Sequence, residues 1–514
     1  QRETVVCRYN KRRGYRMMQN PNKILEILSK NTIRDNNSWK HKDLYRQLFN
    51  TEIFALAYQN IYANKGSMTP GVDGKTADGT SIQRFEKIIE SLRNEKYQPT
   101  PVLRKYIPKK HSDAKRPLGI PSFDDRLVQE AVRLLLESIY EPIFSEHSYG
   151  FRPKRSCHKA VVDIKTNSNG MVWWIEGDIK GFFDNIDHEK MISILRKKIS
   201  DERFLRLIRK FLNAGYLEEW KYNKTFSGTP QGGIVSPILA NIYLNEFDQW
   251  VEEQRKSFNK GEGRKRNPVA KQLNSIRGNL QAMIQRREKW LKDPNIKDET
   301  KQIYQRDIES YKVKIVEHDK MVRGLKLPSL DPMDTSFKRL CYTRYADDWV
   351  IGIIGSKEDA INLKNKAQTF FNEELKLELS SEKTLITHGK DGFKFLGFFI
   401  KKNDGTHIKK NSKGVKVRTM SSKYQILMPQ RKEFEFINDN GYGYFVNGTW
   451  KPSAIKKLFA NDDLEIIEYY NTSFRGLYNY YSICDNVSNL QTARWIWQLS
   501  WGKTMANKYR STKG

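Results

Sequence analysis

Two adjacent carboxylates, Asp347 and Asp348, constrain the fold of this chain more than any other feature. They lie between the apolar segments Leu340–Tyr342 and Val350–Ile353, so residues 337–354 are expected to form two strands joined by a tight turn. Two acids at a hairpin tip repel each other, and each prefers to stay solvated. An isolated Asp-Asp pair is usually an ordinary surface turn, so a functional interpretation requires a second acidic cluster.

That second cluster ends with Asp178, which follows an apolar segment expected to be a strand over residues 171–179. A carboxylate is out of place at the end of an apolar strand unless a cation meets it. Three carboxylates converging from two strands suit Mg²⁺, which prefers hard oxygen ligands. Two such ions can stabilise the attacking and leaving oxygens of a phosphoryl transfer.

The charge balance points to a polyanionic partner. The 514 residues include 91 Lys and Arg against 60 Asp and Glu, a net charge of +31, and both ends of the chain share this excess. Nucleic acid held along much of the protein fits this distribution. An anionic membrane surface is the competing partner, but no single Lys-rich amphipathic helix concentrates the charge. No apolar run is long enough to span a membrane. Four scattered cysteines favour reduced thiols, and we expect a cytoplasmic protein.

Hydrophobic periodicity divides the rest of the chain coarsely. Residues 20–65, 82–92, 124–140 and 189–213 are expected to be helical, residues 102–108 and 393–400 to be strands, and the chain after about residue 410 to be helical and basic. Residues 252–330 are highly charged, with a break at Asp293-Pro294-Asn295. This segment predicts a pair of long, solvated helices, with RNA contact as the alternative role.

Several motifs in order along the chain carry a family resemblance. They are Arg116-Pro117-Leu118-Gly119-Ile120-Pro121, Tyr149-Gly150-Phe151-Arg152-Pro153, Asp178-Ile179-Lys180-Gly181-Phe182-Phe183, Thr229-Pro230-Gln231-Gly232-Gly233 and Tyr345-Ala346-Asp347-Asp348. Each is weak alone, but the ordered set resembles the group II intron-encoded reverse transcriptase/maturase family. The resemblance implies a mixed α+β right-hand polymerase with fingers, an antiparallel-sheet palm and a helical thumb, called maturase domain X.

The resemblance also implies a catalytic site. Asp178, Asp347 and Asp348 match the carboxylates that bind two Mg²⁺ ions, with the Ile179 backbone carbonyl as a further ligand and Asp348 acting more through its charge. Lys383 matches the family lysine proposed to protonate the pyrophosphate leaving group. An ordinary surface lysine is the alternative for that position.

Other matched positions imply contacts with nucleotide, primer and RNA. The incoming nucleotide would be contacted by Lys109 (or its neighbour Lys110), Arg116, the aromatic gate Phe183 and Gln231. The primer would be contacted by Phe395, Leu396 and Gly397, and the intron RNA by Arg475, Tyr478 and Tyr480. A flat ring at the gate would collide with a ribose 2′-OH, so deoxynucleotides would be preferred. For the thumb aromatics, core packing is an equally good interpretation of their helical spacing.

The expected organisation is a basic helical extension over residues 1–70, fingers over 71–170, a palm over 171–400 with helical insertions at about 189–220 and 252–330, and a thumb over 401–514. Many members of the family continue into DNA-binding and Cys/His-containing endonuclease domains, which we do not expect within this chain because it has no paired cysteines or His-rich tract.

The resemblance implies a prokaryotic RNA-directed DNA polymerase that copies intron RNA. It also implies a maturase that binds this RNA in a ribonucleoprotein and promotes splicing and retrohoming. The expected partners are group II intron RNA, a DNA target or primer, and dNTPs, while dimerisation is left open. Two alternatives remain: a non-polymerising RNA-binding splicing factor, and a retron-type reverse transcriptase without an RNA-binding thumb.

Overall fold

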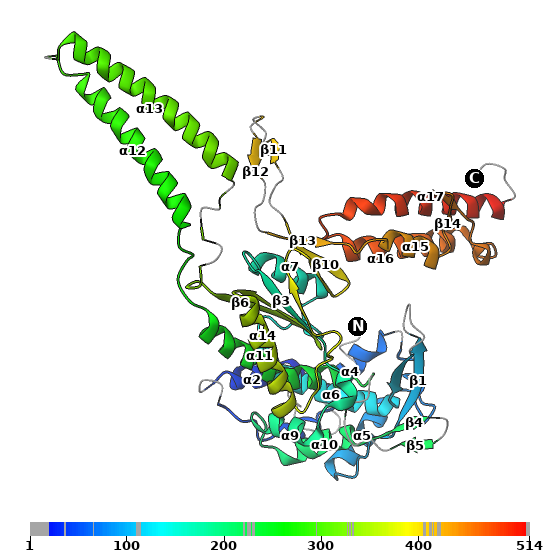
Figure 1. The fold of residues 1–514 in the computed structure, drawn as a ribbon. Coiled ribbons are helices and arrows are strands. Elements are labelled where there is room, and N and C mark those ends of the chain that lie inside the picture. Colours follow the sequence, from blue (N-terminus) through cyan, green and yellow to red (C-terminus); the bar gives the residue numbers. More distant parts are fainter. Residues whose placement is uncertain are drawn as a thin grey trace. The chain divides into compact units, whose positions relative to one another are not determined.

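The chain forms two compact units in a computed structural model (Figure 1). The structure describes residues 20–34, 38–64, 66–108, 115–218, 221–223, 228, 232–294, 296–325, 327, 330–331, 334–403, 408–410, 414, 416–418 and 423–509. One unit comprises residues 1–254 and 341–514, and the other comprises residues 255–340. None of the helices in the described ranges has the length and apolarity needed to cross a bilayer.

The N-terminal third of the larger unit contains a long buried helix, α6 (Phe123–Tyr140), against which the first helices of the chain pack. Ser122 caps α6 by accepting a hydrogen bond from the Asp125 N–H, and most residues along the helix are buried. The other helices here are α2 (Pro21–Thr32), α3 (Leu44–Gln47), α4 (Thr51–Tyr62), α5 (Ile82–Arg93) and α7 (Cys157–Asn167). A four-stranded sheet has the order β2-β1-β4-β5, formed by β1 (Val102–Pro108), β2 (Lys115–Ile120), β4 (Tyr216–Glu218) and β5 (Lys221–Asn223).

A second four-stranded sheet, in the order β6-β7-β3-β8, carries the acidic clusters. Its strands are β3 (Trp173–Gly177), β6 (Arg339–Tyr345), β7 (Asp348–Ile354) and β8 (Leu385–His388). One face packs against α11 (Ser236–Phe258) and α14 (Lys357–Glu373), where Phe247 and Phe371 contact the ring of Trp349 (Figure 1). On the other face, Trp174 packs against Phe393 and Tyr424. Short helices α8 (Phe182–Asn185), α9 (His188–Arg196) and α10 (Glu202–Leu212) follow β3 along the chain.

The C-terminal part of this unit has its own apolar core. Ile437, Tyr442, Ile466, Tyr470 and Ile496 are among its fully buried members. The core is enclosed by α15 (Lys432–Asp439), α16 (Asp463–Tyr481) and α17 (Leu490–Lys508), together with the hairpin of β14 (Gly443–Val446) and β15 (Thr449–Pro452). It is preceded by β9 (Phe393–Phe395), β10 (Phe398–Lys402), β11 (Ile408–Lys410), β12 (Lys416–Arg418) and β13 (Tyr424–Leu427).

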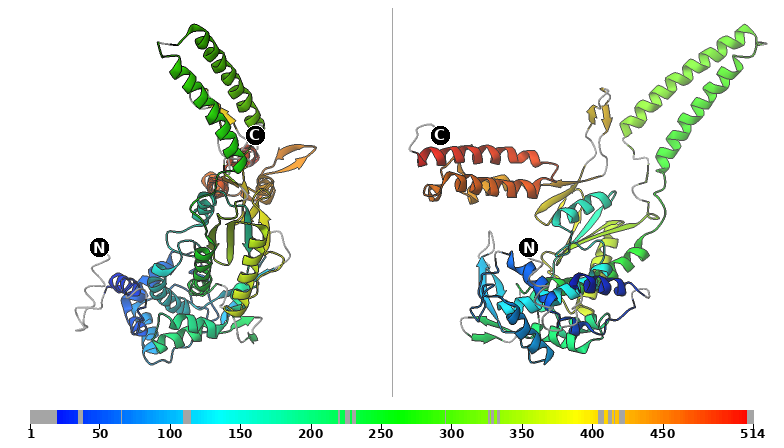
Figure 2. Two further views of the ribbon diagram at one scale, coloured as in Figure 1. Left: turned by 60° about the vertical axis from the view of Figure 1, so that its left-hand side comes forward. Right: turned by 180° about the vertical axis from the view of Figure 1, so that it is seen from behind.

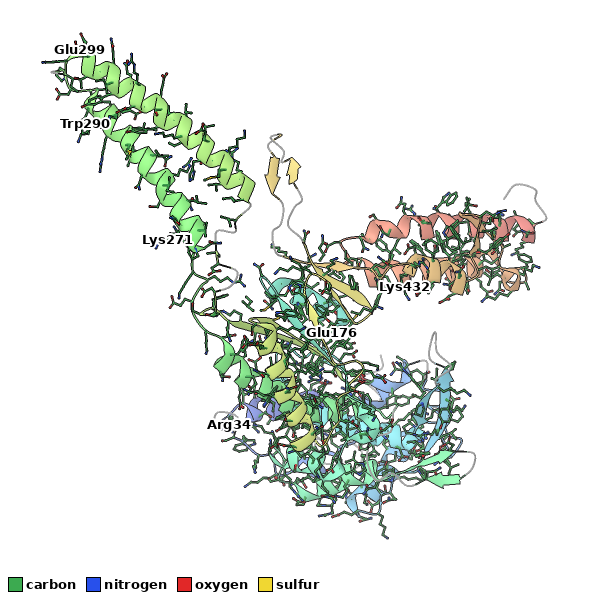
Figure 3. All side chains as sticks on the ribbon, viewed as in Figure 1. Arg34, Glu176, Lys271, Trp290, Glu299 and Lys432 are labelled. Atoms are coloured by element: carbon green, nitrogen blue, oxygen red, sulfur yellow. The ribbon has the colours of Figure 1, made fainter. Side chains whose placement is uncertain are left out.

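The smaller unit contains an αα-hairpin of α12 (Pro268–Trp290) and α13 (Asp298–Leu325), which run side by side in every view (Figures 1 and 2). Ion pairs from Arg277 to Asp319 and from Arg287 to Asp307 connect the two helices. Trp290 and Glu299 lie near the same end of the hairpin (Figure 3). The two long, solvated helices expected from the sequence are therefore present.

Three expectations about local structure were wrong. The helical stretch expected over 189–213 is two helices separated by residues 197–201, and the insertion expected over 189–220 ends in strand rather than helix. The strand expected over 393–400 is two strands, because Leu396 and Gly397 form a turn with positive φ angles. Between residue 410 and α16 the described chain contains four strands, β12 to β15, and the helix α15, rather than helix alone. The division into fingers, palm and thumb stays a prediction.

Candidate functional site

The two acidic clusters meet at one end of the central sheet. Strands β3 and β7 pair antiparallel, with Gly177 opposite Trp349. Extending this register by one residue places Asp178 opposite Asp348. Asp347 belongs to the β6–β7 turn, so the fold brings together the three carboxylates predicted to act together.

Packing of the sheet determines which way these acids point. A Cβ on Gly177 would collide with the indole of Trp349, so the close pairing at this position requires glycine. Trp349 faces α11 and α14. Because successive side chains of a strand alternate between faces, Asp178 and Asp348 point to the opposite face.

Desolvation and the proximity of like charges both perturb the carboxyl groups of this cluster. Desolvation by the surrounding protein, followed by repulsion from Asp347 and Asp178, raises the pKa of Asp348 to about 6, although its side chain is partly exposed. Desolvation also raises the pKa of Asp347, with a smaller contribution from Asp178, while its own backbone N–H, Lys383 and Arg116 lower it. The cluster therefore favours an added cation.

Lys383 already supplies one positive charge to this cluster. Its Nζ atom lies 2.9 Å from Oδ2 of Asp178. The hydrogen bond to Asp178 is the main cause of a raised pKa for Lys383, so the ammonium form is stabilised. The structure thus places this predicted residue beside the carboxylates.

The Ile179 carbonyl faces the same region. Ile179 forms an isolated antiparallel bridge with Leu379, and the two hydrogen bonds of the bridge are donated by the N–H groups of Lys180 and Ser380. In this pattern the bridged residue's own N–H and C=O point away from its partner. Leu379 lies on the side of β3 that pairs with β8. The Ile179 carbonyl therefore points toward the other side, where β7 begins at Asp348.

The donor set suits a hard divalent cation. No group of three or more His, Cys, Asp or Glu side chains in the described ranges is arranged to hold a metal ion as it stands. However, carboxylates whose charges repel one another, with a peptide carbonyl at the same edge, are the ligand types that Mg²⁺ takes. Binding would require the Lys383 ammonium to shift from Asp178, which is feasible because the Lys383 side chain is mostly exposed.

The structure describes only some of the residues predicted to contact nucleotide. Arg116 is exposed on β2, and its charge lowers the pKa of Asp347. Phe183, on α8, is half-buried and packs edge-on against Phe182, with ring centroids 5.2 Å apart. Lys109 (with its alternative Lys110) and Gln231 lie outside the described residues.

The predicted primer-grip residues form a turn that contacts α16. Leu396 and Gly397 join β9 to β10 with φ angles of +49° and +74°, and Phe395 is buried. The Tyr480 hydroxyl donates a hydrogen bond to the Leu396 carbonyl at 2.7 Å, and its ring stacks on Phe398. Tyr480 therefore supports this turn, and its assignment to RNA stays a prediction.

The other two predicted RNA-binding residues are exposed on α16. Arg475 and Tyr478 both face solvent, and 49% of Tyr478 is accessible. Helical spacing had also suggested that the apolar and aromatic residues along α16 pack in the core. Only some of them do: Tyr470 and Tyr481 are buried, whereas Leu464 is 65% exposed.

Arg344 lies near the end of β6, shortly before the acidic turn, and its sequence context predicted no role for it. The structure buries its guanidinium completely against Asp248 of α11. Both charges occur in apolar surroundings, within β6 and within the buried stripe of α11. A charged residue in each apolar pattern was the available signal, but only the tertiary structure pairs the two.

Comparison with known proteins gives two family matches. Residues 107–262 match the family described as reverse transcriptase (RNA-dependent DNA polymerase), and residues 421–513 match the family described as type II intron maturase. The first match contains the segment around Asp178, and the second contains α16 and α17.

Individual relatives agree with these matches. The group II intron-encoded protein LtrA of Lactococcus lactis subsp. cremoris is 44% identical over 492 residues, which cover 95% of this chain and 78% of the relative. An uncharacterized 91 kDa protein in a cob intron of Schizosaccharomyces pombe is 37% identical over 91% of this chain and 54% of its own length. Protein YkfC of Escherichia coli K12 is 33% identical over 76% of this chain and 88% of its own length.

Proposed function

This chain belongs to the family of group II intron-encoded reverse transcriptases and maturases, and from that premise we propose that Asp178, Asp347 and Asp348 form its polymerase site. The RNA-directed DNA polymerase activity and the maturase function follow from the family. The assignment of residues rests on one observation: three carboxylates converge at the end of β3 and β7, with Lys383 bound to Asp178.

The proposed reaction is attack of a primer 3′-OH on the α-phosphate of a dNTP. Two Mg²⁺ ions bound here would supply the positive charge that stabilises the attacking and leaving oxygens. Asp178 and Asp347 would hold them through carboxylate oxygens, with the Ile179 carbonyl as a further ligand. Asp348 would act mainly through its charge.

Protein side chains would perform the remaining tasks. A lysine ammonium keeps its proton at neutral pH, so Lys383, once released from Asp178, could donate a hydrogen bond or a proton to the departing pyrophosphate. Arg116 offers a planar, bidentate fork for the triphosphate. The Phe183 ring would exclude a ribose 2′-OH and select deoxynucleotides.

Binding of intron RNA follows from the maturase match, and we propose that the exposed Arg475 and Tyr478 on α16 contribute to it. An arginine beside an exposed aromatic ring can contact phosphate and stack on an unpaired base. DNA primer and dNTPs are the further proposed ligands.

Primer extension on an RNA template tests the catalytic assignment. Asp347→Ala should reduce extension by more than about 100-fold, the scale on which a single electrostatic catalyst acts, while affinity for intron RNA stays within about twofold. Asp391→Ala, in an exposed turn before β9, is the matched control and should extend normally. An inactive wild-type chain would instead support a non-polymerising splicing factor, and equal loss of RNA binding in Asp347→Ala would indicate a structural role.

A further inference from the structure

A buried ion pair lies beneath the turn that carries the catalytic carboxylates. Nε and Nη2 of Arg344 donate to the two oxygens of Asp248 at 2.7 and 2.6 Å, and both side chains are fully buried. Tyr342 donates a further hydrogen bond to Asp248 at 2.6 Å. Burying two charges costs desolvation energy that their attraction does not reliably repay, so such a pair is weak evidence for a role in stability alone.

The same guanidinium connects this pair to the turn itself. Nη1 of Arg344 donates to the Ala346 carbonyl at 2.9 Å and to Oδ1 of Asn241 at 3.1 Å, and Nη2 donates to Oγ of Ser148 at 2.8 Å. One side chain thus joins α11, the loop of residues 145–150 and the peptide immediately before Asp347. A lysine could not make all these contacts, because its ammonium lacks the planar fork of arginine.

The turn needs such support because its conformation is costly. Ala346 has a φ angle of +56°, in the left-handed region that residues other than glycine adopt at a cost. The 145–150 loop abuts the turn so closely that a Cβ on Gly150 would collide with the Ala346 backbone nitrogen. Asn241 holds this loop in turn by donating to the Gly150 carbonyl at 2.7 Å.

We propose that Arg344, anchored by Asp248 and Asn241, is a positioning residue that sets where the Asp347–Asp348 turn lies relative to Asp178. This inference rests on the proposed function, because it acts through the catalytic carboxylates. Arg344 reaches the turn from the face of the sheet that α11 covers, whereas Asp178 and Asp348 point to the opposite face. It therefore governs the spacing of the carboxylates without contacting substrate.

Direct binding of Mn²⁺ to the full chain, followed by electron paramagnetic resonance, tests the proposal without relying on activity. Arg344→Lys keeps the positive charge but loses the simultaneous contacts to Asp248 and Ala346. We expect its Mn²⁺ dissociation constant to rise at least tenfold, and primer extension to lose kcat more than it raises the KM for dNTP.

Arg126→Lys is the matched control. Arg126 is also buried, and it donates to the backbone carbonyls of Pro121 and Gly66, away from the turn. We expect it to lower the melting temperature to a similar extent but to leave Mn²⁺ affinity within twofold. If Arg344→Lys matches this control in Mn²⁺ affinity, Arg344 is merely structural and the proposal is wrong.

Two further variants, neither of which replaces Arg344 or Asp248, keep the proposal open to refutation if Arg344→Lys does not fold. Ser148→Ala removes a single hydrogen bond from Arg344, and Gly150→Ala displaces the turn from outside. Both should weaken Mn²⁺ binding, and unchanged affinity in both would overturn the proposal.

Asp347→Ala separates this inference from the proposed function. If Asp347→Ala abolishes extension and Mn²⁺ binding while the Arg344, Ser148 and Gly150 variants leave both unchanged, only the positioning role falls. If Asp347→Ala binds Mn²⁺ and extends primers as the wild type does, both the catalytic assignment and the positioning role of Arg344 are wrong.

Discussion

Replacement of Asp348 by Asn should stabilise the metal-free protein, because it removes an unfavourably placed charge. The pKa of Asp348 is raised from 3.8 to about 6 in the folded chain. A folded-state pKa above the unfolded-state value means that the native protein binds the proton more tightly. Protonated Asp348 therefore stabilises the folded state. This contribution is fully present below about pH 4 and is lost as the pH rises through the window from about 4 to 6.

The size of this effect follows from the shift. Two pKa units correspond to about 3 kcal/mol at about 1.36 kcal/mol per unit. Because the Asp348 side chain is partly exposed, solvent screening reduces the expected contribution to about 1 kcal/mol. We therefore expect Asp348→Asn to have a free energy of unfolding about 1 kcal/mol above that of the wild type at pH 7.5, and equal to it near pH 4.

Urea unfolding in EDTA at both pH values measures this difference, with Asp391→Asn as the control for removing an exposed carboxylate. Added Mg²⁺ should reverse the order, because cation binding stabilises the wild type by mass action and stabilises the variant less. Identical pH dependence of the wild type and Asp348→Asn would refute the argument that like charges are crowded at this site. A gain of equal size in Asp391→Asn would show a general charge effect instead.

Three further outcomes are expected. Phe183→Ala should raise ribonucleotide incorporation by at least about tenfold in single-nucleotide extension assays, and unchanged selectivity would remove the gate assignment. Tyr480→Phe loses the hydrogen bond to the Leu396 carbonyl, which contributes about 1 kcal/mol net. Primer–template affinity, measured by fluorescence anisotropy, should therefore fall about fivefold. A selective loss of intron-RNA affinity would favour a direct RNA contact instead. RNA affinity should fall steeply with salt, and a logarithmic slope shallower than about −2 would contradict contact with several phosphates.

Local sequence patterns predicted much of the central sheet and of the site it carries. Alternating apolar residues predicted the hairpin of β6 and β7, and Asp178 was recognised as an acid ending an apolar strand. The break at Pro294 located the two helices of the αα-hairpin. These predictions succeeded because each depends on nearby residues, for which periodicity and turn propensity are direct physical signals.

Predictions failed where a turn or a distant contact overrides local propensity. The stretch from Phe393 to Ile400 has the composition of one continuous strand, but Gly397 and the bond from Tyr480 to Leu396 turn it into two. Tyr480 was assigned to RNA because its segment resembles the maturase thumb, whereas its support of this turn is visible only in its bond to Leu396 and its packing against Phe398.

The sequence by itself predicted which carboxylates could act together and that a polyanion would be bound, because residue type and net charge are properties of the chain. The tertiary structure decided how the acids are held. Asp248 and Arg344 are 96 positions apart in sequence, yet they form one buried pair beneath the turn. Burial and register depend on which elements meet, and no local pattern encodes the desolvation and the neighbouring charges that together raise the pKa of Asp348.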